Sequence, residues 1–373
     1  MTSRRALRTI GSIRSVSTAA LASALVLAVS SCSLIGSGED DVAAEQKVVL
    51  LTHSDFSLPD EVIAGFEKES GYTLDIRPTD GVGNLVNLVA DQAGKPSGDV
   101  VFGVDNTFAS RVLDAGAIAP YGADLPAGAA AYALPGDGAG DGADDGADDG
   151  AGDLVPIDSG NVCVNIDDTW FAKRKIDPPQ TLDDLTDPTY KNLFVTPSAT
   201  GSSPGLAFLL TTVAAYGDAW PDYWQKLLDN GAKIAKGWSE GYYGDFTGGG
   251  GDGDRPIVLS YDSSPAFTIA DDGTSTTSAL LDTCFQQVEY AGVLAGTDNE
   301  AGATALVDYL LGPAVQGALP ESMYVFPVLD GTALPADWAA HAERPTDPYS
   351  LDPAEIGANR EDWLLEWNDL ITR

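Results

Sequence analysis

Short apolar runs alternate with segments of helical spacing along most of the chain beyond residue 46. The runs 48–52, 99–103 and 256–261 are apolar on consecutive residues, which is typical of strands that are buried on both faces. Between the first two runs lies an amphipathic helical pattern that Gly71 ends. This alternation of strand and helix predicts an α/β fold with a largely parallel sheet.

Two further helical patterns lie in the C-terminal half. Residues 205–216 form a long apolar run that Gly217 stops, which predicts a helix. Near the C-terminus, apolar residues recur at helical spacing and make an aromatic stripe: Ile356, Trp363, Trp367 and Leu370. We interpret this stripe as core packing and not as a ligand site.

Residues 136–153 interrupt the pattern, because they contain seven Gly, seven Asp and four Ala. Asp carboxylates suit calcium, but a calcium loop needs ligands at fixed offsets and usually a bidentate Glu, which this run lacks. We therefore interpret it as a solvated, mobile insertion.

The first 31 residues have the order of a secretory signal: a basic region, an apolar run too short to span a bilayer, and small residues. Val29-Ser30-Ser31-Cys32 resembles the bacterial lipobox, in which the cysteine is lipidated and begins the mature protein. We therefore predict a signal peptide over 1–31 and a lipidated tether over 32–46 that anchors the chain to the cell membrane. An ordinary signal with a coincidental cysteine is the alternative.

The chain has 20 basic against 56 acidic residues and a formal net charge of −36. This charge argues against nucleic acid or anionic lipid as a partner. Besides Cys32, the cysteines are Cys163 and Cys284. An oxidising compartment favours a disulfide between these two, and two free buried thiols are the alternative.

No catalytic motif and no paired-histidine metal motif stands out, so neither an enzyme nor a cofactor or metal is expected. Aromatic residues instead occupy loops at the ends of predicted strands and helices, notably Trp238, Tyr261 and Tyr324. Such loops collect at the carboxyl ends of an open α/β sheet, where ligands bind. The hydroxyl-rich run 197–205 leads directly into a helix and suits an anion or plain capping.

Several blocks of the sequence resemble the bacterial periplasmic thiamine-binding proteins. They include Ser203-Pro204-Gly205-Leu206, Lys236-Gly237-Trp238-Ser239-Glu240, Leu259-Ser260-Tyr261 and Ser264-Pro265-Ala266. The resemblance runs over most of residues 47–370 and leaves out the acidic insertion. It implies a monomer that captures thiamine or a thiamine phosphate and passes it to the permease of an ABC importer.

The resemblance also implies a type II periplasmic-binding fold, with two α/β lobes joined by a hinge of strands. The first lobe would take 47–154 and return over 287–315, and the second would take 155–286. Residues 316–373 would pack mainly on the second lobe. The crossings would lie near 155–162 and 287–290.

By position, the resemblance assigns ligand contacts to Asp80, Trp238, Tyr261 and Tyr324. It places Ser202, Ser203 and Gly205 nearest any phosphate. Asp105 would pair with the amino group or the cationic ring, and Asp55 and Ser264 lie in matching loops. Two positions depart from the family: the loop 52–56 lacks a tyrosine that relatives carry, and Tyr324 stands where some relatives have tryptophan.

Two rival hypotheses remain. The adjacent tyrosines Tyr242 and Tyr243 resemble those of ferric-ion binders of the same fold. Thiamine-degrading enzymes of this fold use a cysteine nucleophile, for which Cys163 would be the candidate unless it is bonded to Cys284.

Overall fold

The computed structural model describes residues 46–134 and 153–373. The predicted signal peptide (1–31), the lipidation site Cys32 and the tether up to residue 45 lie outside the described residues, as does nearly all of the acidic insertion. Within the described part, no helix combines the length and hydropathy needed to cross a membrane.

The predicted parallel sheet is present in two pieces that two long antiparallel strands connect. In chain order the strands are β1 (Gln46–His53), β2 (Tyr72–Thr79), β3 (Val100–Asp105), β4 (Ile118–Ala119), β5 (Val155–Asp167), β6 (Phe194–Pro197), β7 (Lys233–Ala235), β8 (Ile257–Tyr261), β9 (Thr277–Leu294) and β10 (Phe326–Pro327). They form a ten-stranded sheet with the order β2-β1-β3-β9-β5-β8-β6-β7, in which β4 pairs with β9 and β10 with β5.

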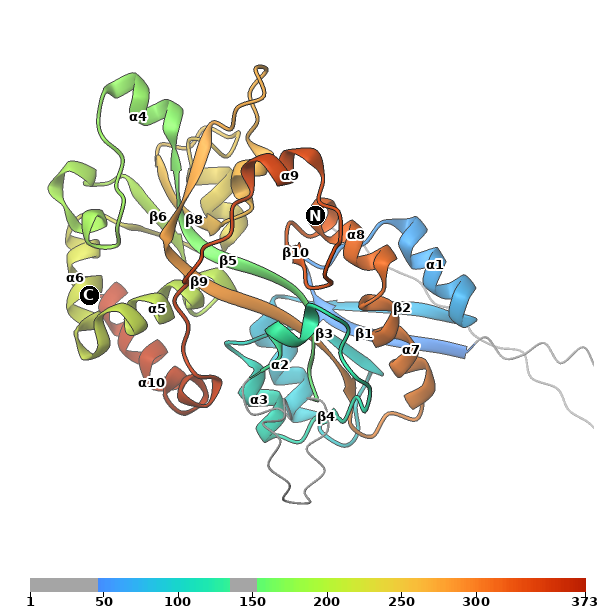
Figure 1. Cartoon of the computed structure of the whole chain (residues 1–373). Helices are drawn as coiled ribbons and strands as arrows, with labels where there is room; N and C mark the ends of the chain where they lie inside the picture. Colours follow the sequence, from blue (N-terminus) through green and yellow to red (C-terminus); the bar gives the residue numbers. More distant parts are fainter. Residues whose placement is uncertain (1–45, 135–152) are drawn as a thin grey trace, which may run out of the picture. The chain divides into compact units, whose positions relative to one another are not determined.

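The strands β1, β2 and β3 are parallel, and so are β6, β7 and β8. Between these two groups, β5 and β9 run antiparallel to each other and to their outer neighbours. Figure 1 shows them crossing from one group to the other. The chain therefore enters the second group along β5 and returns along β9.

Helices cover both groups of parallel strands. They are α1 (Asp60–Ser70), α2 (Val82–Asp91), α3 (Ala109–Asp114), α4 (Asp168–Arg174), α5 (Ser203–Tyr216), α6 (Trp220–Asp229), α7 (Glu300–Leu310), α8 (Pro313–Ser322), α9 (Ala336–His341) and α10 (Pro353–Ile371). The helix predicted before Gly71 is α1, which has acids in its first turn and ends at Gly71 with a left-handed φ of 75°.

Consecutive apolar residues in the strands are explained by burial on both sheet faces. In β1, Leu50 packs in one cluster with Phe66 of α1, whereas its neighbour Leu51 packs in another with Leu85 of α2. The fully buried strand β3 divides its side chains between the same two clusters. A strand in this position cannot alternate with polar residues, because both of its faces are dry.

The second group of strands has a core of its own. The helix α5 is buried along most of its length and packs against β5 and β8. The predicted aromatic stripe of α10 contributes Trp367, which is fully buried and meets Trp224 of α6 edge to face. The interpretation of this stripe as core packing is confirmed.

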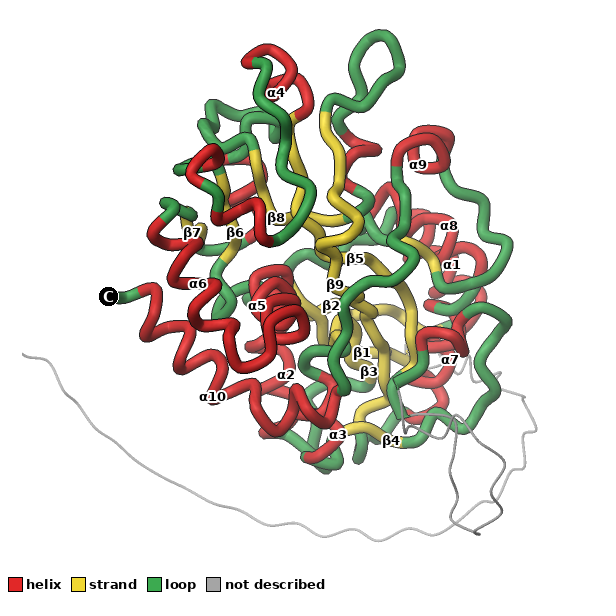
Figure 2. Tube along the Cα trace, turned by 60° about the vertical axis from the view of Figure 1, so that its left-hand side comes forward, coloured by secondary structure: helices red, strands yellow, loops and turns green. Residues whose placement is uncertain are grey.

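The segment 316–373 divides between the two cores. Leu319 and Val328 pack with β1 and β3, whereas α10 packs with α5 and α6. Figure 2 shows α10 lying along α6 and near α3, which it also contacts. Trp338 of α9 also packs with Ala266, just after β8.

Candidate functional site

A cleft of about 1030 Å³ opens where the loops at the strand ends converge. The carboxyl ends of β1 and β2 contribute from one group of strands, and those of β7 and β8 contribute from the other. The crossing strands β5 and β9 supply further residues between them. This is the place where open α/β sheets bind ligands.

Most of the predicted site residues line this cleft. They are Asp55, Asp80, Ser202, Ser203, Trp238, Tyr261, Ser264 and Tyr324. The structure thus brings together side chains from six separate loops and strand ends. Their common location agrees with the sequence-based prediction, although their contacts with a ligand remain a proposal.

Trp238 forms one aromatic wall of the cleft. Its ring stacks on Tyr242 with 4.9 Å between centroids and an interplanar angle of 16°, and Tyr243 meets it edge to face. Its Nε1–H donates to Ser260 Oγ over 2.9 Å. The short π-helix Glu240–Asp245 carries both tyrosines, so this irregular turn determines where the two rings lie against Trp238.

Burial raises the pKa of Tyr242 to about 12, and the neighbouring Tyr243 adds to the shift. The Tyr242 phenol therefore stays neutral at physiological pH. Its ring packs against the Trp238 ring, and because it is buried it limits the movement of that ring.

Tyr324 and Phe267 form a second aromatic pair at the rim. Each is 44% exposed, and their rings meet edge to face with centroids 4.6 Å apart. Tyr324 has a positive φ of 63°, which is unusual for a residue with an aromatic side chain. Ser263 Oγ donates to the Tyr324 carbonyl over 2.8 Å and helps to hold this turn. Strained residues of this kind concentrate at ligand-binding loops.

The predicted residue Ser264 has a supporting position. Its hydroxyl lies 2.7 Å from Ser260 Oγ, which in turn accepts from Trp238, and it accepts from the Tyr261 backbone N–H. It therefore links the Trp238 wall to the end of β8.

Two predicted site residues do not line the cleft. Asp105 is fully buried, and its Oδ1 accepts from the backbone N–H and the hydroxyl of Thr107. Gly205 lies inside the first turn of α5, where an added Cβ would come within 2.3 Å of the Ser198 carbonyl oxygen. Their roles as ligand contacts stay predictions: in this structure Asp105 caps the turn after β3, and Gly205 permits close packing of α5 on the preceding turn.

The floor of the cleft contains residues that the sequence did not single out. His53, Asp158 and Glu289 line it and are at most 7% exposed. Asp158 and Glu289 face each other as cross-strand partners on β5 and β9. A usable sequence signal existed, because both are acidic residues inside strands that are otherwise buried.

Acidic side chains outnumber basic ones in the described lining of the cleft. Its lining includes Asp55, Asp80, Asp158, Glu240 and Glu289, and no Lys or Arg occurs among its described lining residues. Low-dielectric walls with charge of one sign focus the field and attract a ligand of the opposite sign. The site therefore suits a cation with flat faces.

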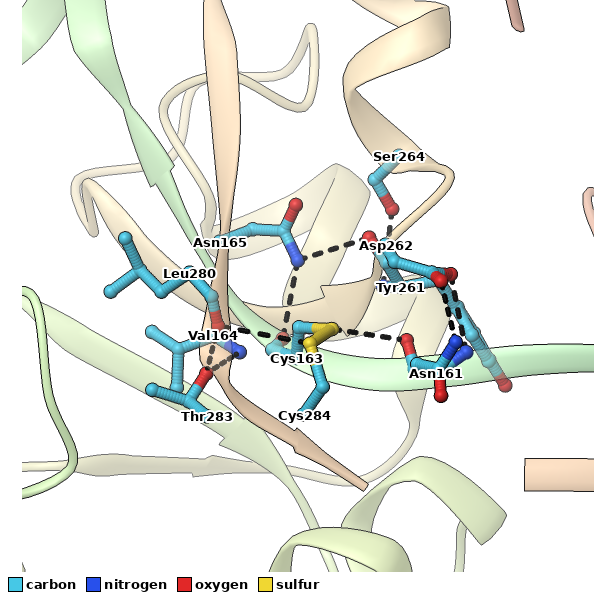
Figure 3. Close-up of a disulfide and its surroundings, with 10 residues drawn as sticks. All are labelled: Asn161, Cys163, Val164, Asn165, Tyr261, Asp262, Ser264, Leu280, Thr283 and Cys284. Atoms are coloured by element: carbon cyan, nitrogen blue, oxygen red, sulfur yellow. Dashed lines mark hydrogen bonds between the residues drawn. A yellow bond between two sulfur atoms is a disulfide. The ribbon is translucent and has the colours of Figure 1, made fainter. Parts of the chain in front are cut away.

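Cys163 of β5 and Cys284 of β9 form a disulfide, with their Cα atoms 4.1 Å apart (Figure 3). The predicted bridge is confirmed, and the alternative of two free thiols is wrong. Figure 3 also shows Asn161 donating to the Asp262 carboxyl from its backbone and its side chain, so β5 is tied to the end of β8.

A two-lobed α/β body with a deep cleft between its strand ends defines a solute-binding protein. Residues 61–346 match the family model described as bacterial extracellular solute-binding protein. The chain belongs to this family.

The curated relatives are more specific in name. The thiamine-binding periplasmic protein of Escherichia coli (strain K12) is 31% identical over 299 residues, which cover 79% of this chain and 82% of that protein. The protein of the same name from Brucella melitensis is 29% identical and covers 87% of this chain and 92% of its own length.

Solved structures agree on the fold. A periplasmic thiamin binding protein aligns with a TM-score of 0.72 and 26% identity, covering 88% of this chain and 96% of that chain. Iron-bound HitA from Pseudomonas aeruginosa aligns with a TM-score of 0.65 at 18% identity, covering 87% and 99%. The predicted type II periplasmic-binding fold and the resemblance that implied it are confirmed.

Proposed function

We propose that this chain captures thiamine, or a thiamine phosphate, outside the cytoplasm and delivers it to the permease of an ABC importer. The observation that carries the proposal is the cleft itself. It combines aromatic side chains at Trp238, Tyr261 and Tyr324 with acidic residues, and its described lining includes no Lys or Arg. Thiamine is a flat cation, and each cation–π contact contributes about 0.5–2 kcal/mol. The names of the relatives point to the same ligand.

The tail of the ligand would lie at the N-terminus of α5. Ser202, Ser203 and Pro204 line the cleft there, and a helix N-terminus favours an anionic group. The other wall would hold the rings, with Trp238 and Tyr324 on their faces. Asp80 and Asp55, at the ends of β2 and β1, would accept hydrogen bonds from the amino group.

Calorimetry on the domain without its signal and tether tests this proposal. We expect micromolar or tighter binding of thiamine, its monophosphate or its diphosphate, and we expect Trp238→Ala to weaken it about 10- to 100-fold through lost stacking. Trp170→Ala is the matched control, because Trp170 lies on α4 away from the cleft. Absence of heat with all three compounds would contradict the proposal.

Neither rival function is supported by a specific contact. The Tyr242 ring stacks beneath Trp238, and the described residues contain no group of three His, Cys, Asp or Glu side chains suited to a metal. A thiamine-degrading activity would need a free Cys163 thiolate, whereas this sulfur is bonded to Cys284. A visible charge-transfer band on adding ferric iron would favour the iron binder instead.

The proposal includes a lipid anchor at Cys32, which would keep a secreted domain beside its permease. Two or more acyl chains are needed for stable anchoring. Metabolic labelling with palmitate should mark the wild-type chain and leave Cys32→Ala unlabelled and released from the membrane fraction. Labelling that persists in the variant would contradict this part of the proposal.

A further inference from the structure

Glu289 occupies the floor of the cleft. It lies on β9, is 7% exposed and is among the lining residues. On one side His53 Nε2 faces its Oε1 at 3.4 Å, and on the other side it meets the Asp158 carboxyl across the β5–β9 pair. These neighbours determine which of the groups carries a charge.

The proton on His53 points toward Glu289. The backbone N–H of Asp55 donates to His53 Nδ1 over 3.2 Å, so Nδ1 is unprotonated and the ring proton lies on Nε2. Burial acts to lower the pKa of His53, but Glu289, Asp55 and Asp105 together outweigh this effect and the pKa is raised. The imidazole and Glu289 thus form a buried acid–base pair.

Asp158 lies on the other side of Glu289, on the facing strand β5. Both of its oxygens are buried, and among the described residues no hydroxyl, amide or amine donates to them. Burial, together with the neighbouring Glu289 charge, raises the pKa of Asp158 well above its usual value. Two neighbouring buried carboxyl groups disfavour being ionised together, so the protonated form of Asp158 is favoured beside Glu289.

Glu289 is therefore a buried acidic side chain between the His53 imidazole and the Asp158 carboxyl group. The lining offers no Lys or Arg to balance it within the described residues, and its one ion-pair contact there is the imidazole of His53. This single imidazole also interacts with Asp55 and Asp105, so acidic groups outnumber it at the floor. A positive charge brought by the ligand would therefore be attracted to Glu289.

The aromatic side of the site meets this charge at Tyr261. Burial is the main cause of the raised pKa of Tyr261, and Glu289 is the largest electrostatic contributor to it. Tyr261 and Glu289 both line the cleft. A ring stacked on Tyr261 would bring its positive charge close to Glu289.

We propose that Glu289 is the counter-ion for the cationic ring of the bound solute, with His53 and Asp158 as its positioning residues. The chemical class that this arrangement recognises is a flat heterocyclic cation. For thiamine the partner would be the thiazolium ring, and this assignment rests on the proposed function. Glu289 takes the role that the sequence-based prediction gave to Asp105.

The test compares Glu289→Gln with Glu366→Gln, which removes the same charge from an exposed position on α10. Calorimetry and competition titrations measure thiamine and, separately, its neutral aminopyrimidine half. We expect Glu289→Gln to weaken thiamine about 30-fold or more, to change binding of the neutral half less than threefold, and Glu366→Gln to change neither. Thermal unfolding of the unliganded domains is measured in parallel.

The outcomes separate a counter-ion from a structural residue. The unliganded Glu289→Gln domain should unfold at or above the wild-type temperature, because one of several mutually repelling buried carboxyl groups has been removed. A lower unfolding temperature, an equal loss for the neutral fragment, or an unchanged thiamine affinity would overturn the assignment. If wild type binds no thiamine, the proposed function fails, while the unfolding comparison still tests Glu289.

Discussion

At the scale of single residues, acidic side chains in this protein act according to their surroundings. Asp105 accepts two hydrogen bonds from Thr107 in the turn that follows β3, whereas Glu289 lines the cleft. Asp262, just after β8, accepts from Asn161 N over 3.1 Å and from Asn161 Nδ2 over 2.6 Å. Acidic residues thus serve here as a turn cap, as a lining residue of the cleft and as a link between two strands.

The environment of Asp262 predicts a pH-dependent stability. Burial raises its pKa from 3.8 to about 6, despite the hydrogen bonds from Asn161. Because the folded pKa lies above the unfolded one, the stabilisation from this group is complete below about pH 4 and is lost as the pH rises through about 6. Between pH 8 and pH 5 this group alone should raise the free energy of unfolding by about 1 kcal/mol.

Urea unfolding at the two pH values checks this expectation. The Asp262→Asn variant should lose this part of the pH dependence, whereas the exposed control Asp347→Asn should keep it. An identical pH slope in wild type and Asp262→Asn would show that the carboxyl does not titrate in this range.

At the scale of elements, the N-terminus of α5 depends on a close approach of two backbones. The helix starts at Ser203 against the turn that follows β6, and Gly205 faces the carbonyl oxygens of Pro197 and Ser198. This contact positions Ser202 and Ser203 at the cleft. A glycine here serves packing, since it lacks the Cβ that would collide.

Gly205→Ala should therefore destabilise the protein by about 1–3 kcal/mol and weaken ligand binding, because the helix start must move away from the turn. Gly317→Ala is the matched control: Gly317 lies in α8, and its added Cβ would meet nothing within 4 Å. That substitution should stabilise by roughly 0.5–1 kcal/mol through helix propensity. Chemical denaturation of both variants measures the difference, and equal effects would refute the packing argument.

At the scale of the whole described molecule, the two groups of strands depend on β5 and β9 for their connection. The Cys163–Cys284 bridge ties these strands over a sequence separation of 121 residues. The bridge lies among buried residues, and neither cysteine lines the cleft. Its contribution should therefore be to stability and not to ligand contact.

Replacing both cysteines by alanine should lower the free energy of unfolding by about 2–5 kcal/mol and leave the thiamine affinity within a few-fold of wild type. Denaturant titration and calorimetry on the same preparations separate the two effects. Reduction of the wild-type bridge is the control and should give the same loss of stability. A large change in affinity at unchanged stability would assign the bridge to the site instead.

The buried strands, the helices α1, α5 and α10, and the carboxyl-end position of the site were predictable, because each depends on local pattern and on the geometry of α/β sheets. The type II fold and most of the cleft residues came through the family resemblance. The acids at the floor were not singled out, since Asp158 and Glu289 lie far apart in the chain and meet only through the pairing of β5 with β9.

The sequence by itself determined the class of fold, the loops that carry the aromatic side chains and the pair of cysteines available for a bridge. These follow from hydrophobic periodicity, turn residues and composition, which are local properties. Only the tertiary structure decided which carboxylates face the cleft, that Gly205 serves packing, and that Glu289 lies between His53 and Asp158. Burial and long-range strand pairing set these features, and neither is present in a short stretch of sequence.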